Sequence, residues 1–179
     1  MTVSTTDSPP AESAVRWLTD DEQSAWRAFL AMKTELDAQL GRDMQDSSGL
    51  SIADFSVLVP LSEHPEGRLR ILELARGLQW EKSRLSHQLT RMEQRGLIER
   101  SNCREDRRGS FVVLTADGRR AVEAAAPRHV ESVRRYLFDL LTPDQVAVLG
   151  DISRTVRDRL AAQCAGREAT CAESDAGSC

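Results

Sequence analysis

The side chains whose types and spacing best suit specific binding lie between positions 82 and 91. Leu85, Leu89 and Met92 recur at helical spacing and mark the buried face of a predicted helix. At about 100° per residue, the opposite face carries small hydrogen-bonding groups with cations beside them. The hydrogen-bonding residues are Ser83, Ser86, His87 and Thr90, and the cations are Lys82, Arg84 and Arg91.

Such a helix fits the major groove of DNA, which admits one helix and offers base edges to polar side chains. We expect Ser83, Ser86, His87 and Thr90 to read base edges and the three cations to contact phosphates. A solvated amphipathic helix in a bundle is the alternative for the whole segment, and a surface histidine without a role is the alternative for His87.

A second candidate binding segment is the Arg-rich stretch that ends at Gly109. An arginine at a hairpin tip can enter the minor groove, where narrow A·T-rich segments concentrate negative potential. We expect Arg108, helped by Arg107, to do so, and Asp106 to orient one guanidinium through a bidentate ion pair. A solvated charged turn is the alternative.

The charges of the chain are unevenly distributed around these two segments. The net charge is −4, which alone argues weakly against nucleic acid as a partner. Between Arg68 and Arg120, however, 13 residues are basic and 7 are acidic, whereas the rest of the chain has 11 basic and 21 acidic residues. A basic centre between acidic flanks is typical of a DNA-binding lobe carried on a separate scaffold.

The elements that must position these residues are mainly helical. We expect helices over residues 19–45 and 52–62, and two more between 71 and 95 with a turn permitted by Gly77. Strands are predicted at 97–100 and 111–115, and helices over 116–141, bent at Pro127, and 142–162. Residues 68–70 are expected to be extended. Segments 1–17 and 163–179 are expected to be disordered.

Local sequence signals mark several helix ends. The expected N-caps are Thr19, which forms a capping box with Glu22, Ser51 and Thr142. Gly96 is expected to end the helix that precedes the first strand of the hairpin. Trp80 is expected to pack at the entry of the longer helix, with direct contact to a phosphate as the alternative.

Two helices followed by a β-hairpin with a basic tip predict the fold class. It is mainly α with a small β-hairpin wing: a winged helix-turn-helix lobe at 51–115 plus a helical dimerisation region at 19–45 and 116–162. The dimerisation helices carry more apolar surface than one small lobe could cover. We therefore expect a homodimer.

Other function classes find little support in the sequence. No apolar run approaches the ~18 residues of a membrane span and the first residues do not form a signal peptide, so we expect no membrane association and a cytoplasmic location. The three histidines have no catalytic spacing and no ligand cluster suggests a metal, so neither an enzyme nor a cofactor is expected. Of the four cysteines, only Cys103 precedes a basic loop that could stabilise a thiolate.

These motifs resemble the MarR family of bacterial transcriptional regulators over residues 20–162. The family's Asp-x-Arg wing signature ending in Leu-Thr is matched by Asp106, Arg108, Leu114 and Thr115, and a second match runs from Arg95 to Arg100. The resemblance implies a homodimer whose two winged lobes read the half-sites of a pseudo-palindromic operator in double-stranded DNA. It also implies repression of nearby genes, relieved by a small aromatic or anionic effector or by an oxidant.

One departure from the family bears on oxidant sensing. Peroxide-sensing members have a cysteine near the start of the first helix, and residues 1–50 contain none. A redox response through Cys103 stays open as an alternative, and so does a winged helix used only for protein contacts. For a ligand pocket, the resemblance suggests Trp26, Phe29, Phe55 and Arg68 as lining residues, with a core role as the alternative for the three aromatic residues.

Overall fold

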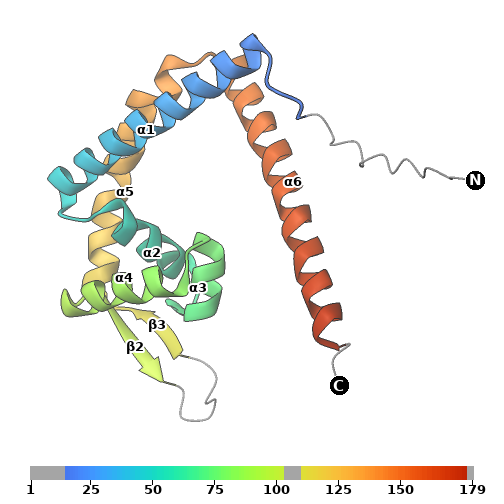
Figure 1. Ribbon diagram of the computed structural model, residues 1–179. Coiled ribbons are helices and arrows are strands. Elements are labelled where there is room, and N and C mark those ends of the chain that lie inside the picture. Colours follow the sequence, from blue (N-terminus) through green and yellow to red (C-terminus); the bar gives the residue numbers. More distant parts are fainter. Residues whose placement is uncertain (1–14, 103–109, 177–179) are drawn as a thin grey trace, which may run out of the picture. The chain divides into compact units, whose positions relative to one another are not determined.

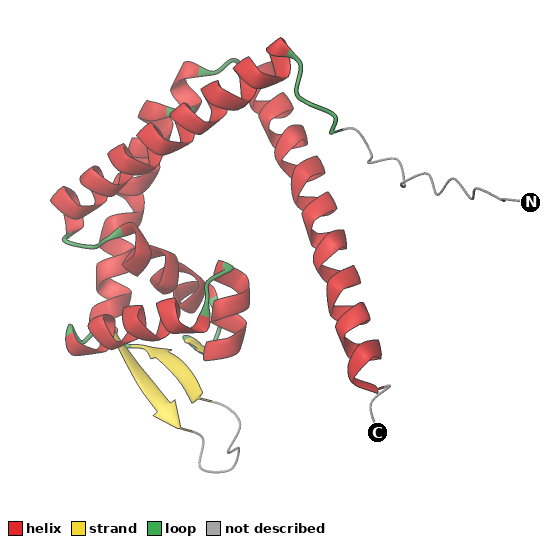
Figure 2. Cartoon of the chain, in the orientation of Figure 1, coloured by secondary structure: helices red, strands yellow, loops and turns green. Residues whose placement is uncertain are grey.

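The computed structural model describes residues 15–102 and 110–176, with side chains described as far as residue 163 apart from that of Asn102. The chain divides into two compact units, residues 1–38 and 39–179. The fold is mainly helical with one small sheet, as predicted (Figures 1 and 2). None of its described helices is both long enough and apolar enough to cross a membrane.

The first unit holds the N-terminal part of α1 (Asp20–Ser48), which continues into the second. Thr19 and Glu22 form the predicted capping box: the Glu22 N–H donates to Thr19 Oγ1 at 3.2 Å, and the Thr19 N–H donates to Glu22 Oε2 at 2.8 Å. Trp26 and Phe29 stack with ring centroids 5.7 Å apart and remain about half exposed. This part of α1 therefore leaves a large apolar surface uncovered.

Helix α2 (Ile52–Glu63) opens the winged lobe and follows Gly49, whose φ of +67° ends α1. Ser51 caps it as predicted, because its Oγ accepts the Asp54 N–H at 3.0 Å while Asp54 accepts from Ser51 in return. Pro60 lies inside the last turn, and the helix ends three residues later.

Helices α3 (Ile71–Leu78) and α4 (Lys82–Gln94) form the helix-turn-helix. The prediction that Gly77 makes the turn is wrong, because Gly77 lies within α3 and the left-handed residue is Gln79, at φ 54°. A left-handed non-glycine residue costs roughly 1 kcal/mol. A hydrogen bond from Gln79 Nε2 to the Arg76 carbonyl (2.8 Å) and one from the Trp80 N–H to the Ala75 carbonyl (3.0 Å) offset that cost.

The sheet has three antiparallel strands, in the order β1 (Arg68–Arg70), β3 (Ser110–Leu114), β2 (Ile98–Asn102). Arg68 pairs with Val113, and Ile98 pairs with Leu114. The extended segment predicted at 68–70 is thus a true edge strand of the wing. Gly96, at φ +71°, separates α4 from β2 as predicted.

The core of the lobe lies between α2, α3, α4, α5 and the sheet. Its fully buried side chains are apolar: Leu50, Val57, Leu58, Leu61, Leu74, Leu85, Leu89, Met92, Ile98 and Val112. The buried stripe predicted for α4 is confirmed, since Leu85, Leu89 and Met92 are each 0% exposed.

Helix α5 (Ala116–Tyr136) begins at Thr115, whose Oγ1 accepts the Gly118 N–H at 2.9 Å. It passes through Pro127 and ends five residues before the predicted end at Leu141; a 3-10 turn, η1 (Phe138–Leu140), follows it. Helix α6 (Pro143–Ala176) starts at the predicted Thr142 cap, where the Gln145 N–H donates to Thr142 Oγ1 at 3.3 Å.

Helix α6 extends beyond its predicted end at residue 162. The tail predicted to be disordered from residue 163 is helical as far as Ala176. Its alanines, at 161, 162, 165, 169, 172 and 176, have the highest helix propensity of any residue, and the one glycine among them costs only about 1 kcal/mol.

Candidate nucleic-acid interface

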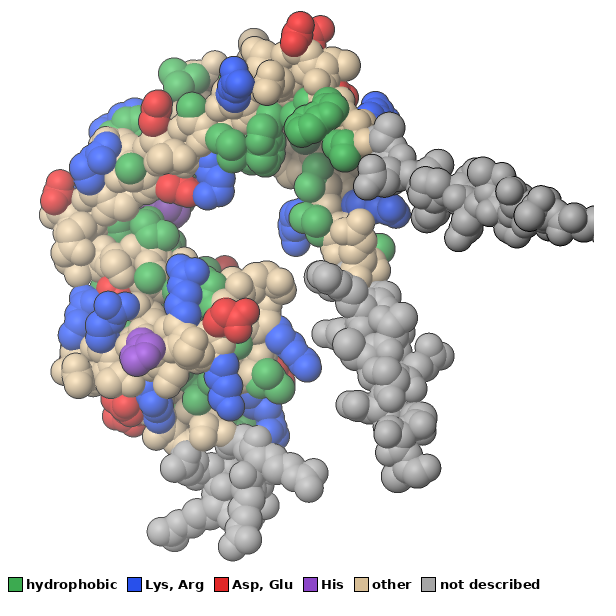
Figure 3. All heavy atoms as spheres, in the orientation of Figure 1, with side chains coloured by type: hydrophobic (Ala, Val, Ile, Leu, Met, Phe, Trp, Pro, Cys, Tyr) green, Lys and Arg blue, Asp and Glu red, His purple; other side chains and the backbone are tan. Residues whose placement is uncertain are grey.

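The outer face of α4 carries every residue that the sequence assigned to it. The side chains opposite the buried stripe are all exposed: Lys82, Ser83, Arg84, Ser86, His87, Thr90 and Arg91. Lys and Arg side chains gather over the α3 and α4 part of the lobe (Figure 3). This face can offer hydrogen bonds and positive charge to one ligand at once.

Arg84 is held by an aromatic ring. Its guanidinium carbon lies 4.2 Å from the ring centroid of Trp80, within the range of a cation–π contact. Trp80 is itself half-buried and packs against the core, as predicted. The ring thereby fixes the start of α4 and limits the rotamers open to Arg84.

The hydroxyl of Thr90 has less freedom than the sequence suggested. It donates its only proton to the Ser86 carbonyl at 3.0 Å and accepts a hydrogen bond from Arg100 Nη2 at 2.7 Å. In this arrangement Thr90 can offer a base a lone pair or its methyl group, but no proton. Arg100 of β2 also donates to the Ser86 carbonyl at 3.0 Å, so it ties the wing to α4. Sequence reasoning missed this contact because β2 and α4 meet only in the folded lobe.

A buried polar network joins α4 to α2. Asp54, 3% exposed, accepts hydrogen bonds from Gln88 Nε2 at 2.7 Å and from Arg95 Nη1 at 2.7 Å, besides those from Ser51. Gln88, also 3% exposed, in turn accepts from Arg91 Nη2. The sequence held one signal for this network, since Gln88 is a polar residue at a helical position beside Leu85 and Leu89.

The network sets the ionisation of Asp54. Burial raises the pKa of the carboxyl, but the hydrogen bonds from Ser51 and the hydrogen bond and charge of Arg95 outweigh it, so the pKa lies below its ordinary value. A depressed carboxyl pKa stabilises the fold above the unfolded-state pKa of about 3.9, and that contribution is lost as the pH falls through the folded-state value.

We expect Asp54→Asn to lower the free energy of unfolding by about 2 kcal/mol at pH 7, because the Arg95 guanidinium loses its charged acceptor. The difference from the parent should shrink as the pH falls below the unfolded-state pKa of about 3.9, toward the lower pKa at which Asp54 of the folded parent is protonated. Urea unfolding at pH 7 and pH 3 measures both values. Asp117→Asn, at an exposed ion pair with Arg120, is the control. A difference that is the same at both pH values would contradict the assignment.

The basic tip of the wing joins two paired strands. Asn102 pairs with Ser110, so residues 103–109 connect β2 to β3. Cys103, Asp106, Arg107 and Arg108 belong to this connection and lie outside the described residues.

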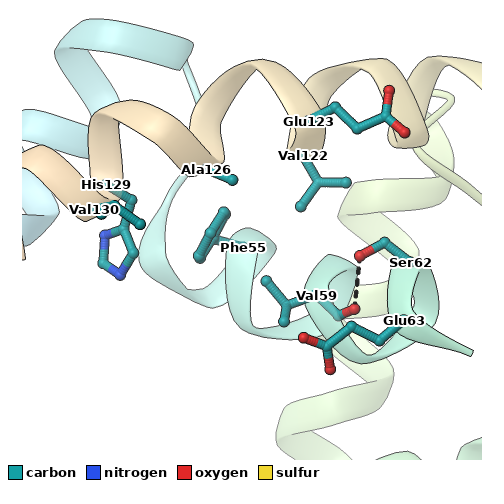
Figure 4. A pocket seen from close by; sticks show the side chains of 9 residues that line it. All are labelled: Phe55, Val59, Ser62, Glu63, Val122, Glu123, Ala126, His129 and Val130. Atoms are coloured by element: carbon teal, nitrogen blue, oxygen red, sulfur yellow. Dashed lines mark hydrogen bonds between the residues drawn. The ribbon is translucent and has the colours of Figure 1, made fainter.

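Of the residues predicted for a ligand pocket, the two in the winged lobe, Phe55 and Arg68, do not line the same cavity. Phe55 lines a cavity of about 300 Å³ between α2 and α5 (Figure 4). Arg68 is not in its lining: it pairs with Glu66 and stacks on Phe111, 5.1 Å from the ring centroid. Trp26 and Phe29 belong to the other unit of the chain.

The cavity walls are mostly apolar, and two glutamates are among the lining residues. Its lining residues are Phe55, Val59, Ser62, Glu63, Val122, Glu123, Ala126, His129 and Val130. The rings of Phe55 and His129 lie 4.9 Å apart, and burial lowers the pKa of His129, so this imidazole is neutral at pH 7. Among the side chains that the structure describes, no group of three His, Cys, Asp or Glu residues could hold a metal ion.

Comparison with known proteins agrees with this geometry. Residues 50–110, which span most of the winged lobe, match a family model described as MarR family. The crystal structure of AbsC, a MarR family transcriptional regulator from Streptomyces coelicolor, is 44% identical to the chain, with a TM-score of 0.78 over 83% of this chain and 99% of that one. The chain belongs to the MarR family. It is therefore a DNA-binding transcriptional regulator, of a family that is normally non-enzymatic.

Two further relatives extend the comparison. Sco3205 of Streptomyces coelicolor, a MarR family regulator solved in complex with DNA, is 41% identical, with a TM-score of 0.77 over 81% of this chain and 91% of that one. YfiV of Bacillus subtilis, an uncharacterised HTH-type transcriptional regulator, is 28% identical over 130 residues, 72% of this chain and 78% of that protein.

Proposed function

We propose that this MarR protein is a homodimeric repressor whose two α4 helices read the half-sites of a pseudo-palindromic operator from the major groove. The observation that carries the proposal is the outer face of α4, where every side chain assigned to bases or phosphates is exposed. The DNA complex of the relative Sco3205 supports this mode of action.

Each side chain has a proposed role on the DNA. Ser83, Ser86 and His87 read base edges by hydrogen bonds, and Thr90 contributes an acceptor or its methyl group. Lys82, Arg84 and Arg91 bind phosphates. At the wing, Arg108 enters the minor groove with help from Arg107, and Asp106 orients a guanidinium.

The proposed dimer rests on apolar side chains that water would otherwise surround. Val148, Ile152, Val156 and Leu160 recur every four residues along α6 and are 53–58% exposed. A stripe of this spacing is the usual seam between packed helices. A second copy of the chain would cover it and would place two recognition helices about 34 Å apart, one helical turn of DNA.

The cavity beside Phe55 is the proposed effector site. His129 is neutral there, and the charged side chains of its lining are Glu63 and Glu123. Of the small aromatic or anionic effectors that the family resemblance implies, these walls favour a neutral or cationic aromatic compound over an anion. The test adds benzylamine (a cation), benzyl alcohol (neutral) or benzoate (an anion) to an operator-binding titration. We expect the first two compounds to weaken operator binding more than benzoate does.

Selection of duplexes from a randomised pool by the purified protein, followed by footprinting, tests the operator proposal. We expect two half-sites related by two-fold symmetry. Arg84→Ala should weaken binding and reduce the dependence of log K on log salt by about 0.9 per protomer, because one phosphate contact is lost. His87→Ala should change the selected sequence, at about 1–3 kcal/mol of discrimination.

Arg128→Ala, which removes an exposed cation of α5, is the matched control and should leave both readouts unchanged. The assignment of α4 as the reading helix would be contradicted if the selected duplexes shared no common sequence. It would also be contradicted if all three variants lost the same amount of operator affinity.

A further inference from the structure

Gln88 occupies an unusual position on the recognition helix. It is 3% exposed, while its neighbours along α4 at 86, 87, 90 and 91 face solvent. A glutamine amide has two donors and an acceptor that need partners when buried. Both ends of the amide are used: Nε2 donates to Asp54 Oδ1 at 2.7 Å, and Oε1 accepts from Arg91 Nη2.

The chemistry of the two partners fixes the orientation of the amide. A carboxylate accepts hydrogen bonds only, and a guanidinium donates them only. Turning the Gln88 amide over would place its oxygen against Asp54 and its NH₂ group against Arg91, so both contacts would become repulsive. Gln88 therefore joins a buried anion to an exposed cation in one defined geometry.

The buried end of this chain of bonds is well anchored. The other oxygen of Asp54 accepts from the Ser51 N–H at 2.9 Å, from Ser51 Oγ at 2.8 Å and from Arg95 Nη1 at 2.7 Å. Arg95 also donates to the Gly49 carbonyl at 3.0 Å. The N-terminus of α2 thus holds Asp54, Asp54 holds Gln88, and Gln88 holds one nitrogen of Arg91.

We propose that Gln88 is a positioning residue that pre-orders the Arg91 guanidinium for its phosphate contact. The inference rests on the proposed role of α4 as the reading helix. A free arginine must lose rotamer freedom when it binds a phosphate, and part of that loss already occurs in the unbound protein when Gln88 holds one of its nitrogens. The other guanidinium donors stay available, because an arginine has five N–H groups.

A double-mutant cycle in the full-length protein tests the proposal. Gln88→Met keeps the volume and removes the amide. Binding to a labelled duplex, selected by the parent protein from a randomised pool, is followed by fluorescence anisotropy. We expect Gln88→Met to weaken binding roughly threefold to tenfold per protomer. Arg91→Ala should cost much less in the Gln88→Met background than in the parent, since its pre-ordering is already lost.

Arg84 provides the matched control, because its guanidinium rests on Trp80 and not on Gln88. Arg84→Ala should cost the same in both backgrounds, whereas a general loosening of the lobe would change both arginine effects alike. If Gln88→Met prevents folding, Gln88→Asn, one methylene too short to reach both partners, enters the same cycle.

The outcomes separate two conclusions. An equal effect of Arg91→Ala in both backgrounds, or parental affinity for Gln88→Met, would overturn the positioning role while the reading role of α4 stands. Parental affinity for both Arg91→Ala and Arg84→Ala in the otherwise unchanged protein would overturn the proposed function itself, and the positioning role with it.

Discussion

Gly118→Ala is expected to destabilise the winged lobe by about 3 kcal/mol or more, the upper range for overpacking a well-packed core. A Cβ at this position would lie 2.0 Å from the Leu97 carbonyl oxygen and 2.9 Å from Leu114 Cδ1. The nearer atom belongs to the backbone and cannot turn away. It also accepts hydrogen bonds from the Thr115 N–H (3.3 Å) and Oγ1 (3.0 Å), so any shift that makes room disturbs the start of α5.

Gly77→Ala is the matched control for this prediction. Gly77 lies within α3, and no atom lies within 4 Å of where its Cβ would be. Alanine should therefore stabilise the protein by about 0.5–1 kcal/mol through helix propensity. Guanidinium unfolding followed by circular dichroism measures both changes. Similar stabilities for the two variants would show that the contact at Leu97 relaxes at little cost.

Ile152→Lys is expected to separate the proposed dimer and to abolish tight operator binding. The substitution places a charge in the middle of the α6 stripe, where pairing with a second copy would bury it without a partner. A monomer binds only one half-site and loses the gain of linked binding, which is typically 100-fold or more, so the affinity should fall at least about 100-fold.

Asp158→Asn is the control for Ile152→Lys, because it adds the same unit of positive charge outside the stripe on α6. It should leave the dimer intact. Sedimentation velocity and operator titration of the two variants give the answer. A dimer of unchanged affinity in Ile152→Lys would mean that the stripe faces something other than a second copy of the chain.

Local patterns explain which parts of the fold could be predicted from the sequence. The caps at Thr19, Ser51 and Thr142 were predicted because a capping box is decided within four residues. The two faces of α4 follow from helical periodicity alone. The family resemblance rested on motifs in the same lobe, where the family model also matches.

Contacts distant in the sequence explain what could not be predicted. Asp54 and Gln88 are 34 residues apart, and no periodicity links a capping residue of one helix to a buried amide of another. The turn at Gln79 was assigned to Gly77 because glycine is the usual left-handed residue. The side chain of Gln79 supplies a hydrogen bond that a propensity argument does not include.

The adjacency of Asp54 and Phe55 on α2 has a thermodynamic consequence. Phe55 forms a wall of the proposed effector cavity, while Asp54 anchors the hydrogen bonds that run through Gln88 to α4. Because both lie in the first turn of one helix, a compound that shifts this turn when it displaces Phe55 would also move Asp54. Linkage is reciprocal, so if such a compound weakens the affinity for DNA, operator DNA would weaken the affinity for the compound by the same factor.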